Sequence, residues 1–118
     1  MPTITLYGIP NCDTVKRARS WLAARDVGYT FHDLKKQGVP PDALAGWVAA
    51  VGWETLVNRK GTTWRQLDSA VRESVVDAAS AQRALREHPS LVKRPVVEWP
   101  GGVSVGFDDA VFNARLSR

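Results

Sequence analysis

Residues 3–22 read TITLYGIPNCDTVKRARSWL, and this segment decides the fold. Its first part, residues 4–7, is short, β-branched and aromatic, and Gly8 and Pro10 follow it, as is typical of a strand that runs into a tight loop. Beyond Cys12 the apolar side chains recur every three to four residues, with polar and basic side chains between them. This spacing predicts an amphipathic helix. The segment therefore predicts a strand, a loop and a helix in that order.

Cys12 is the only cysteine, and it falls where the helix should begin. Backbone N–H groups in the first turn of a helix lack partners within the helix, and the helix dipole is positive there, so both favour the thiolate form. Lys16 lies on the same helical face and should favour it further. Asp13 has two interpretations. Its carboxylate disfavours ionisation of the Cys12 thiol if it points toward the sulfur, or it accepts a hydrogen bond as a cap of the first turn.

Length, composition and charge restrict the class of protein. The 118 residues are 44% hydrophobic, enough for one domain with one core. A lone cysteine excludes a disulfide within the chain, so a redox cycle must take its second sulfur from another molecule. We find no leader-like or membrane-spanning segment and expect a cytoplasmic protein. The net charge of +4 is scattered along the chain and does not favour nucleic-acid binding.

The next elements complete a strand, helix, strand unit. We expect the first helix to end near residues 26–28, with Gly28 in the left-handed conformation that closes a helix. Aromatic and polar side chains alternate over residues 29–33, which predicts a second strand, parallel to the first. His32 on this strand is either a general base or, as we favour, a polar residue on the solvent side, because adjacent Asp33 points to the opposite face.

The middle of the chain lacks a strand pattern. Residues 34–41 carry two prolines and a glycine and read as a loop, and a helix should then run from Pro41 or Asp42 to Val51. Short helical patterns follow at residues 54–57, 63–67 and 73–79, and Ser80 should cap a further helix that reaches His88 before Pro89 stops it. We therefore predict a helical insertion at about residues 41–90 within a single domain spanning residues 1–118.

A basic turn at residues 58–61, NRKG, lies inside this insertion. Its cations either receive an anion or remain solvated, and the residues alone favour the solvated interpretation because most surface cations contribute little.

The C-terminal part predicts a hairpin and a helix. A strand that begins near Pro95 and ends at Trp99 is followed by a glycine turn and a second strand at residues 103–105. The frequency of cis prolines alone favours a trans Arg94-Pro95 bond. Asp108 should cap a final helix that reaches Arg115, with Phe107 and Phe112 packed on each other.

The element order is then strand, helix, strand, helical block, strand, strand, helix. Taken together with YGIPNCDTVK at residues 7–16, NRKGTTWR at 58–65, DAAS at 77–80 and KRPV at 93–96, the chain closely resembles the arsenate reductase (ArsC) family. The resemblance is to the glutathione- and glutaredoxin-coupled type, in the YffB-like branch of the ArsC/Spx superfamily. It implies an α/β fold, a thioredoxin-like βαβ…ββα arrangement with the helical subdomain between the second and third strands.

The resemblance also implies a chemistry and a set of residues. Cys12 would be the nucleophile of a glutathione-dependent thiol reductase, with glutathione as a co-substrate, glutaredoxin as a partner and an anionic or disulfide substrate. No tightly bound cofactor, metal or membrane is implied, and we expect a monomer.

The resemblance also implies residues that bind the substrate. Arg94, before a Pro95 that is typically cis in the family, would face Cys12 and bind anionic substrate groups. The other candidates for binding substrate or glutathione are Asn11, Lys16 and Arg59.

Two departures from the family keep alternatives open. Arsenate reductases of this type carry a third arginine after the Arg-Pro pair, where this chain has residues SVGF at 104–107, which disfavours arsenate as the substrate. Spx-like regulators carry a second cysteine where this chain has Val15, so an internal disulfide switch is excluded while binding to RNA polymerase is not. The rival to an enzyme is a partner-binding module in which Cys12 is a buried structural residue.

Overall fold

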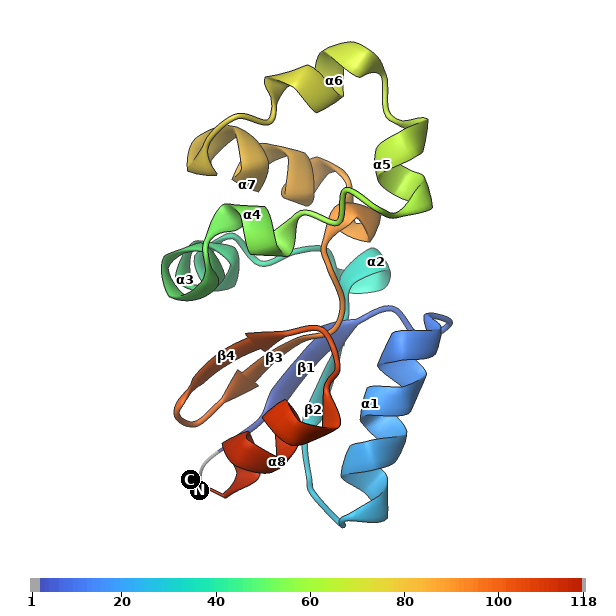
Figure 1. The fold of residues 1–118 in the computed structure, drawn as a ribbon, viewed down its shortest axis with the longest axis vertical. Coiled ribbons are helices and arrows are strands. Elements are labelled where there is room, and N and C mark those ends of the chain that lie inside the picture. Colours follow the sequence, from blue (N-terminus) through green and yellow to red (C-terminus); the bar gives the residue numbers. More distant parts are fainter. Residues whose placement is uncertain (1–2, 118) are drawn as a thin grey trace. The chain divides into compact units, whose positions relative to one another are not determined.

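The computed structural model describes residues 3–117, which form two compact units (Figure 1). One unit contains the chain up to Leu34 together with the chain from Arg94 onward, and the other contains Lys35–Lys93. Within residues 3–117, no helix is both long enough and apolar enough to cross a membrane.

The first unit is built on a mixed four-stranded sheet. Its elements are β1 (Thr5–Gly8), α1 (Asp13–Ala24), β2 (Thr30–Asp33), β3 (Val96–Trp99), β4 (Gly102–Val105) and α8 (Asp109–Leu116). The strand order is β2-β1-β3-β4. β1 pairs with β2 in parallel, whereas β1–β3 and β3–β4 are antiparallel. The predicted α/β class and thioredoxin-like order of elements are confirmed.

Helices α1 and α8 pack on the same face of this sheet (Figure 1). Leu6 and Val97 project from adjacent strands into the core, where they meet the apolar stripe of α1. Phe112 of α8 is fully buried, and its ring makes edge contacts with those of Trp21, Trp99 and Phe107 at centroid distances of 5.4, 5.0 and 4.9 Å. The predicted Phe107–Phe112 packing is confirmed, as is the cap on α8, where Asp108 Oδ1 accepts a hydrogen bond from the backbone N–H of Val111.

Gly8 allows the end of β1 to approach α1 closely. A Cβ atom at this position would lie 2.8 Å from a methyl carbon of Val15, which is shorter than any ordinary contact. Val15 is itself fully buried in the first turns of α1. The loop that carries Cys12 is therefore held between a strand and a helix that meet where the Val15 side chain packs directly on the Gly8 backbone.

The connection after α1 differs from the prediction. The helix ends at Ala24, and Asp26, with φ of 55°, adopts the left-handed conformation that was expected at Gly28. Aspartate tolerates this conformation because its short polar side chain can hydrogen-bond locally. The prediction placed the turn too late because it relied on glycine alone.

Helices fill the segment between β2 and β3. They are α2 (Leu34–Gln37), α3 (Pro41–Val51), α4 (Trp53–Leu56), α5 (Thr62–Gln66), α6 (Ser69–Ser74), α7 (Ala78–Glu87) and the 3₁₀ turn η1 (Pro89–Leu91). Gly52, with φ of 85°, follows α3 at the predicted position. An isolated antiparallel bridge joins Val57 to Val92 inside this unit.

Three local predictions in this segment are wrong. Residues 34–37 form a helical turn rather than a loop. The helix expected over residues 73–79 is divided, because α6 ends at Ser74 and α7 begins at Ala78. The cap of α7 is Asp77, whose Oδ1 accepts from the backbone N–H of Ser80 while Ser80 Oγ accepts from the backbone N–H of Asp77. This reciprocal capping box moves the helix start three residues upstream of the predicted Ser80.

Candidate active site

Cys12 occupies the N-cap position of α1. The loop from Gly8 turns back so that the backbone N–H of Cys12 donates to the carbonyl of Ile9 at 3.1 Å. Its φ and ψ of −85° and 126° are extended, and its carbonyl accepts the first helical hydrogen bond, from the N–H of Lys16 at 2.9 Å. The side chain is neither fully buried nor fully exposed. The thiol therefore faces the open first turn of the helix, as the sequence predicts.

The sheet register brings Arg94 to this loop. Tyr7 lies opposite Val96 in the antiparallel β1–β3 pair, so the residues before β3 run alongside the residues after β1. The Arg94-Pro95 bond is cis, as the resemblance implies and contrary to the expectation from the low frequency of cis prolines, and Pro95 is buried. The Pro95 carbonyl accepts from the N–H of Gly106 at 2.8 Å. From this position the Arg94 side chain hydrogen-bonds the sulfur of Cys12.

These contacts change the acidity of the thiol. Partial burial raises the pKa of Cys12, but the backbone N–H of Val15, the hydrogen bond and charge of Arg94, and the N–H of Thr14 together outweigh it. The net effect is a pKa below that of a free cysteine. The thiolate is the nucleophilic form, so the site can attack an electrophilic sulfur at a pH where an ordinary cysteine is still protonated.

Two other predicted residues of this unit, Asn11 and Lys16, flank Cys12 in the chain. Asn11 is exposed in the loop directly before Cys12. Lys16 is exposed one helical turn further on, and it is not among the groups that lower the pKa of Cys12 within the described chain. Cys12, Arg94 and Pro95 are thus brought together, while Asn11 and Lys16 flank them with side chains open to solvent.

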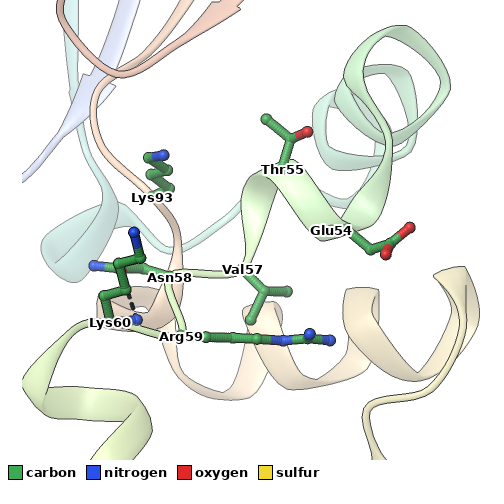
Figure 2. Close-up of a pocket in the computed structure, with 7 residues that line it drawn as sticks. All are labelled: Glu54, Thr55, Val57, Asn58, Arg59, Lys60 and Lys93. Atoms are coloured by element: carbon green, nitrogen blue, oxygen red, sulfur yellow. Dashed lines mark hydrogen bonds between the residues drawn. The ribbon is translucent and has the colours of Figure 1, made fainter.

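Arg59 belongs to the helical unit and lies in its basic turn. Its guanidinium carbon is 5.5 Å from the ring centroid of Trp53 and 5.6 Å from that of Trp64, so two indole rings hold it by cation–π contacts. It also lines a pocket together with Lys60 and Lys93 (Figure 2). The predicted role of Arg59 in binding substrate or glutathione remains a prediction.

A polar cluster on the sheet face opposite α1 and α8 was not expected. The hydroxyl of Tyr7 donates to Glu98 Oε1 at 2.9 Å, and the Tyr7 and His32 rings lie 4.9 Å apart. Burial and the Glu98 carboxylate raise the pKa of Tyr7, which keeps the phenol protonated as a donor. His32 is partly exposed and its ring lies against that of Tyr7, so the solvent side predicted for it is partly covered. The alternation of side chains puts these residues on one face, but their contacts follow only from the register of β1 with β2 for His32 and with β3 for Glu98.

Among residues 3–117 there is no cluster of three or more His, Cys, Asp or Glu side chains placed to hold a metal ion.

This chain has sequence relatives among known proteins. The family model described as "ArsC family" matches residues 7–114. An uncharacterised protein of Haemophilus influenzae is 40% identical over 97% of this chain and 99% of its own length. The global transcriptional regulator Spx of Streptococcus pyogenes is 26% identical over 98% of this chain and 86% of its own length.

Solved structures agree with the fold. The YffB protein superposes with a TM-score of 0.91 at 45% identity, covering 97% of this chain and 99% of that one. An arsenate reductase (ArsC) related protein from Brucella melitensis gives a TM-score of 0.72 at 47% identity, covering 98% and 96%. A family match across nearly the whole chain, supported by these relatives, leads to one conclusion: the chain belongs to the ArsC family.

Proposed function

We propose that this protein is a glutathione-dependent thiol reductase that uses Cys12 as its single nucleophile. The observation that carries the proposal is the environment of the sulfur, which accepts hydrogen bonds from Arg94 and from the first turn of α1 and has a lowered pKa despite partial burial. ArsC relatives named as arsenate-reductase-related are consistent with a reductase. A nucleophile with a perturbed pKa beside a fixed cation is a typical arrangement for a reactive site.

The cycle needs two thiol–disulfide exchanges. In the first, the Cys12 thiolate attacks the sulfur of a glutathionylated substrate, forms a Cys12–glutathione disulfide and releases the substrate thiolate, so the substrate is reduced. In the second, the thiolate of a glutathione molecule, or of a glutaredoxin, attacks the glutathione sulfur of that disulfide. Cys12 leaves as a thiolate. The product is oxidised glutathione when glutathione attacks, or a glutaredoxin–glutathione mixed disulfide when the glutaredoxin attacks. Arg94 would stabilise the Cys12 thiolate both as nucleophile and as leaving group.

Oxidised glutathione tests the first exchange directly. We expect incubation of the folded protein with oxidised glutathione to add one glutathione by intact mass, and peptide mapping to place it on Cys12, because the lowered pKa increases the thiolate fraction over that of a free cysteine. Treatment with reduced glutathione should then restore the original mass. If the folded protein gains no adduct under conditions that modify the denatured chain, the proposal fails. A partner-binding role such as that of the Spx regulators would then be the better interpretation.

Arg94 is expected to set the pH range of this reactivity. An Arg94→Ala variant loses a hydrogen bond and a positive charge that lower the pKa of Cys12, so the pH midpoint of alkylation by iodoacetamide should move upward. Below that midpoint the variant should react more slowly than the wild type. Arg17→Ala is a matched control, since Arg17 lies on α1, the helix that follows Cys12, and its guanidinium donates to Thr14 Oγ1 rather than to the sulfur. Equal midpoints for Arg94→Ala and the wild type would remove Arg94 from the site.

Arsenate is the alternative substrate that the family suggests. The chain lacks a cation at residues 104–107, where the family's third arginine would stand, so one of three positive partners for the oxyanion is missing. We therefore propose a disulfide rather than arsenate as the substrate.

A further inference from the structure

A pocket in the helical unit carries positive charge that the thiol chemistry does not use. It has a volume of about 360 Å³, and Figure 2 shows the residues that line it. They are Glu54, Thr55, Val57, Asn58, Arg59, Lys60 and Lys93. Three of these side chains are cationic and one is anionic, so the lining has an excess of positive charge.

Lys60 and Lys93 supply the accessible part of that charge. Both are exposed, and within residues 3–117 neither ammonium group forms an ion pair or a hydrogen bond. Figure 2 shows the two lysine side chains on one side of the pocket and the Glu54 carboxylate pointing away on the other. The carboxylate is therefore not placed to neutralise them, and two ammonium groups share one region with no anion of the chain beside them.

The backbone holds these two lysines in a fixed relation. Lys93 follows the Val57–Val92 bridge, and its N–H donates to the Leu56 carbonyl at 2.8 Å. On the other segment, the N–H of Asn58 donates to the Leu91 carbonyl at 2.9 Å. These two hydrogen bonds make up the bridge and join the segment before Lys60 to the segment that ends at Lys93. Both lysine side chains therefore start from backbone positions that are fixed before a ligand binds.

The basic turn is ordered by its own side chains. Asn58 Oδ1 accepts from the backbone N–H of Lys60 at 3.3 Å, which leaves the amide NH₂ as a donor. This NH₂ group lies across Gly61, where an added Cβ would come within 2.7 Å of it. Arg59 is held between Trp53 and Trp64, so its charge contributes to the field of the pocket while its guanidinium face is occupied. The groups left to contact a ligand are the Lys60 and Lys93 ammonium groups and the Asn58 amide.

We propose that this pocket is an anion-binding site in which Lys60 and Lys93 contact a carboxylate or phosphate group of a small molecule. Lysine donates three hydrogen bonds and accepts none, so paired lysines select for acceptor-only, negatively charged groups. The Asn58 amide would donate a further hydrogen bond. This proposal concerns the helical unit by itself and does not depend on the reactivity of Cys12.

Two probes distinguish the sources of the anion: inorganic phosphate, and S-methylglutathione, which offers carboxylates without a thiol. In backbone amide NMR titrations of the full chain, at least one probe should shift residues 58–61 and Lys93 with a single saturable binding curve. Lys60→Gln and Lys93→Gln should each weaken that binding about tenfold, and the double variant should abolish it. Arg86→Gln, which removes an exposed charge from α7 in the same unit, should bind as the wild type does.

The control with Cys12→Ser separates this site from the thiol site. Binding in that variant should equal that of the wild type, so failure of the thiol proposal would leave this one standing. Binding by Lys60→Gln and Lys93→Gln at wild-type affinity would overturn the proposal. So would shifts that spread equally over exposed basic residues of α1 and α7, which would indicate unspecific attraction.

Discussion

A Cys12→Ser variant is expected to form no glutathione adduct and to show no glutathione-dependent reduction of disulfides. Cys12 is the only sulfur nucleophile in the chain, and a serine hydroxyl at the same position is not ionised at neutral pH. The loss should be complete rather than partial, because no second thiol can substitute. Intact-mass analysis with oxidised glutathione and a coupled assay with a small disulfide substrate measure the two effects.

The fold should survive this replacement. Serine is among the preferred N-cap residues, and its hydroxyl can accept from the backbone N–H of Val15 at the third helical position, as the Cys12 sulfur does. We expect the free energy of unfolding to stay equal or to rise by up to about 1 kcal/mol. An inactive variant with an intact melting transition therefore isolates the sulfur. Retention of glutathione-dependent activity by this variant would show that Cys12 is not the nucleophile.

A Phe112→Ala variant is expected to lose about 3–5 kcal/mol of unfolding free energy. Phe112 is fully buried, and its ring meets three aromatic rings that come from α1, β3 and the loop before α8. Removing it leaves a cavity and also ends three edge contacts, each worth about 0.5–1.5 kcal/mol beyond burial. A loss of this size is a large part of the total stability of a small domain.

Chemical denaturation followed by tryptophan fluorescence and circular dichroism measures this loss. Val111→Ala is the matched control, because Val111 is the preceding residue of the same helix and 42% exposed. Its effect should stay within about 0.5 kcal/mol. A loss below about 1 kcal/mol for Phe112→Ala would mean that α8 contributes little to the core, contrary to its packing.

The thiol site could be predicted largely from local sequence. Gly8, Pro10 and the apolar spacing after Cys12 act within a few residues of one another, so a strand, a loop and a helix start could be predicted together. Arg94 was reached only through the family resemblance, because its contact with Cys12 depends on the antiparallel register of β1 and β3. Pairing between segments far apart in the chain leaves no periodic pattern in either of them.

The helical unit shows where sequence reasoning fails. Ser80 was expected to cap α7, but Asp77 and Ser80 bond reciprocally, and either residue type is a good cap in isolation. The position of Arg59 between Trp53 and Trp64 depends on α4 and α5 folding toward each other, which no spacing of residues specifies. Nothing in the local sequence around Lys93 indicates a pocket, because the lysine reaches the basic turn only through the Val57–Val92 bridge.

The short β1–β3 ladder has a consequence for how the protein can be assayed. Only three residue pairs align these strands, and they place a guanidinium beside a sulfur that lies almost at the other end of the chain. The enhanced acidity of the sulfur therefore exists only while the native sheet is intact. In a misfolded or denaturant-treated sample the pKa of the thiol should return to that of a free cysteine. Labelling at a pH below that ordinary pKa is therefore a gauge of correctly folded molecules in any preparation.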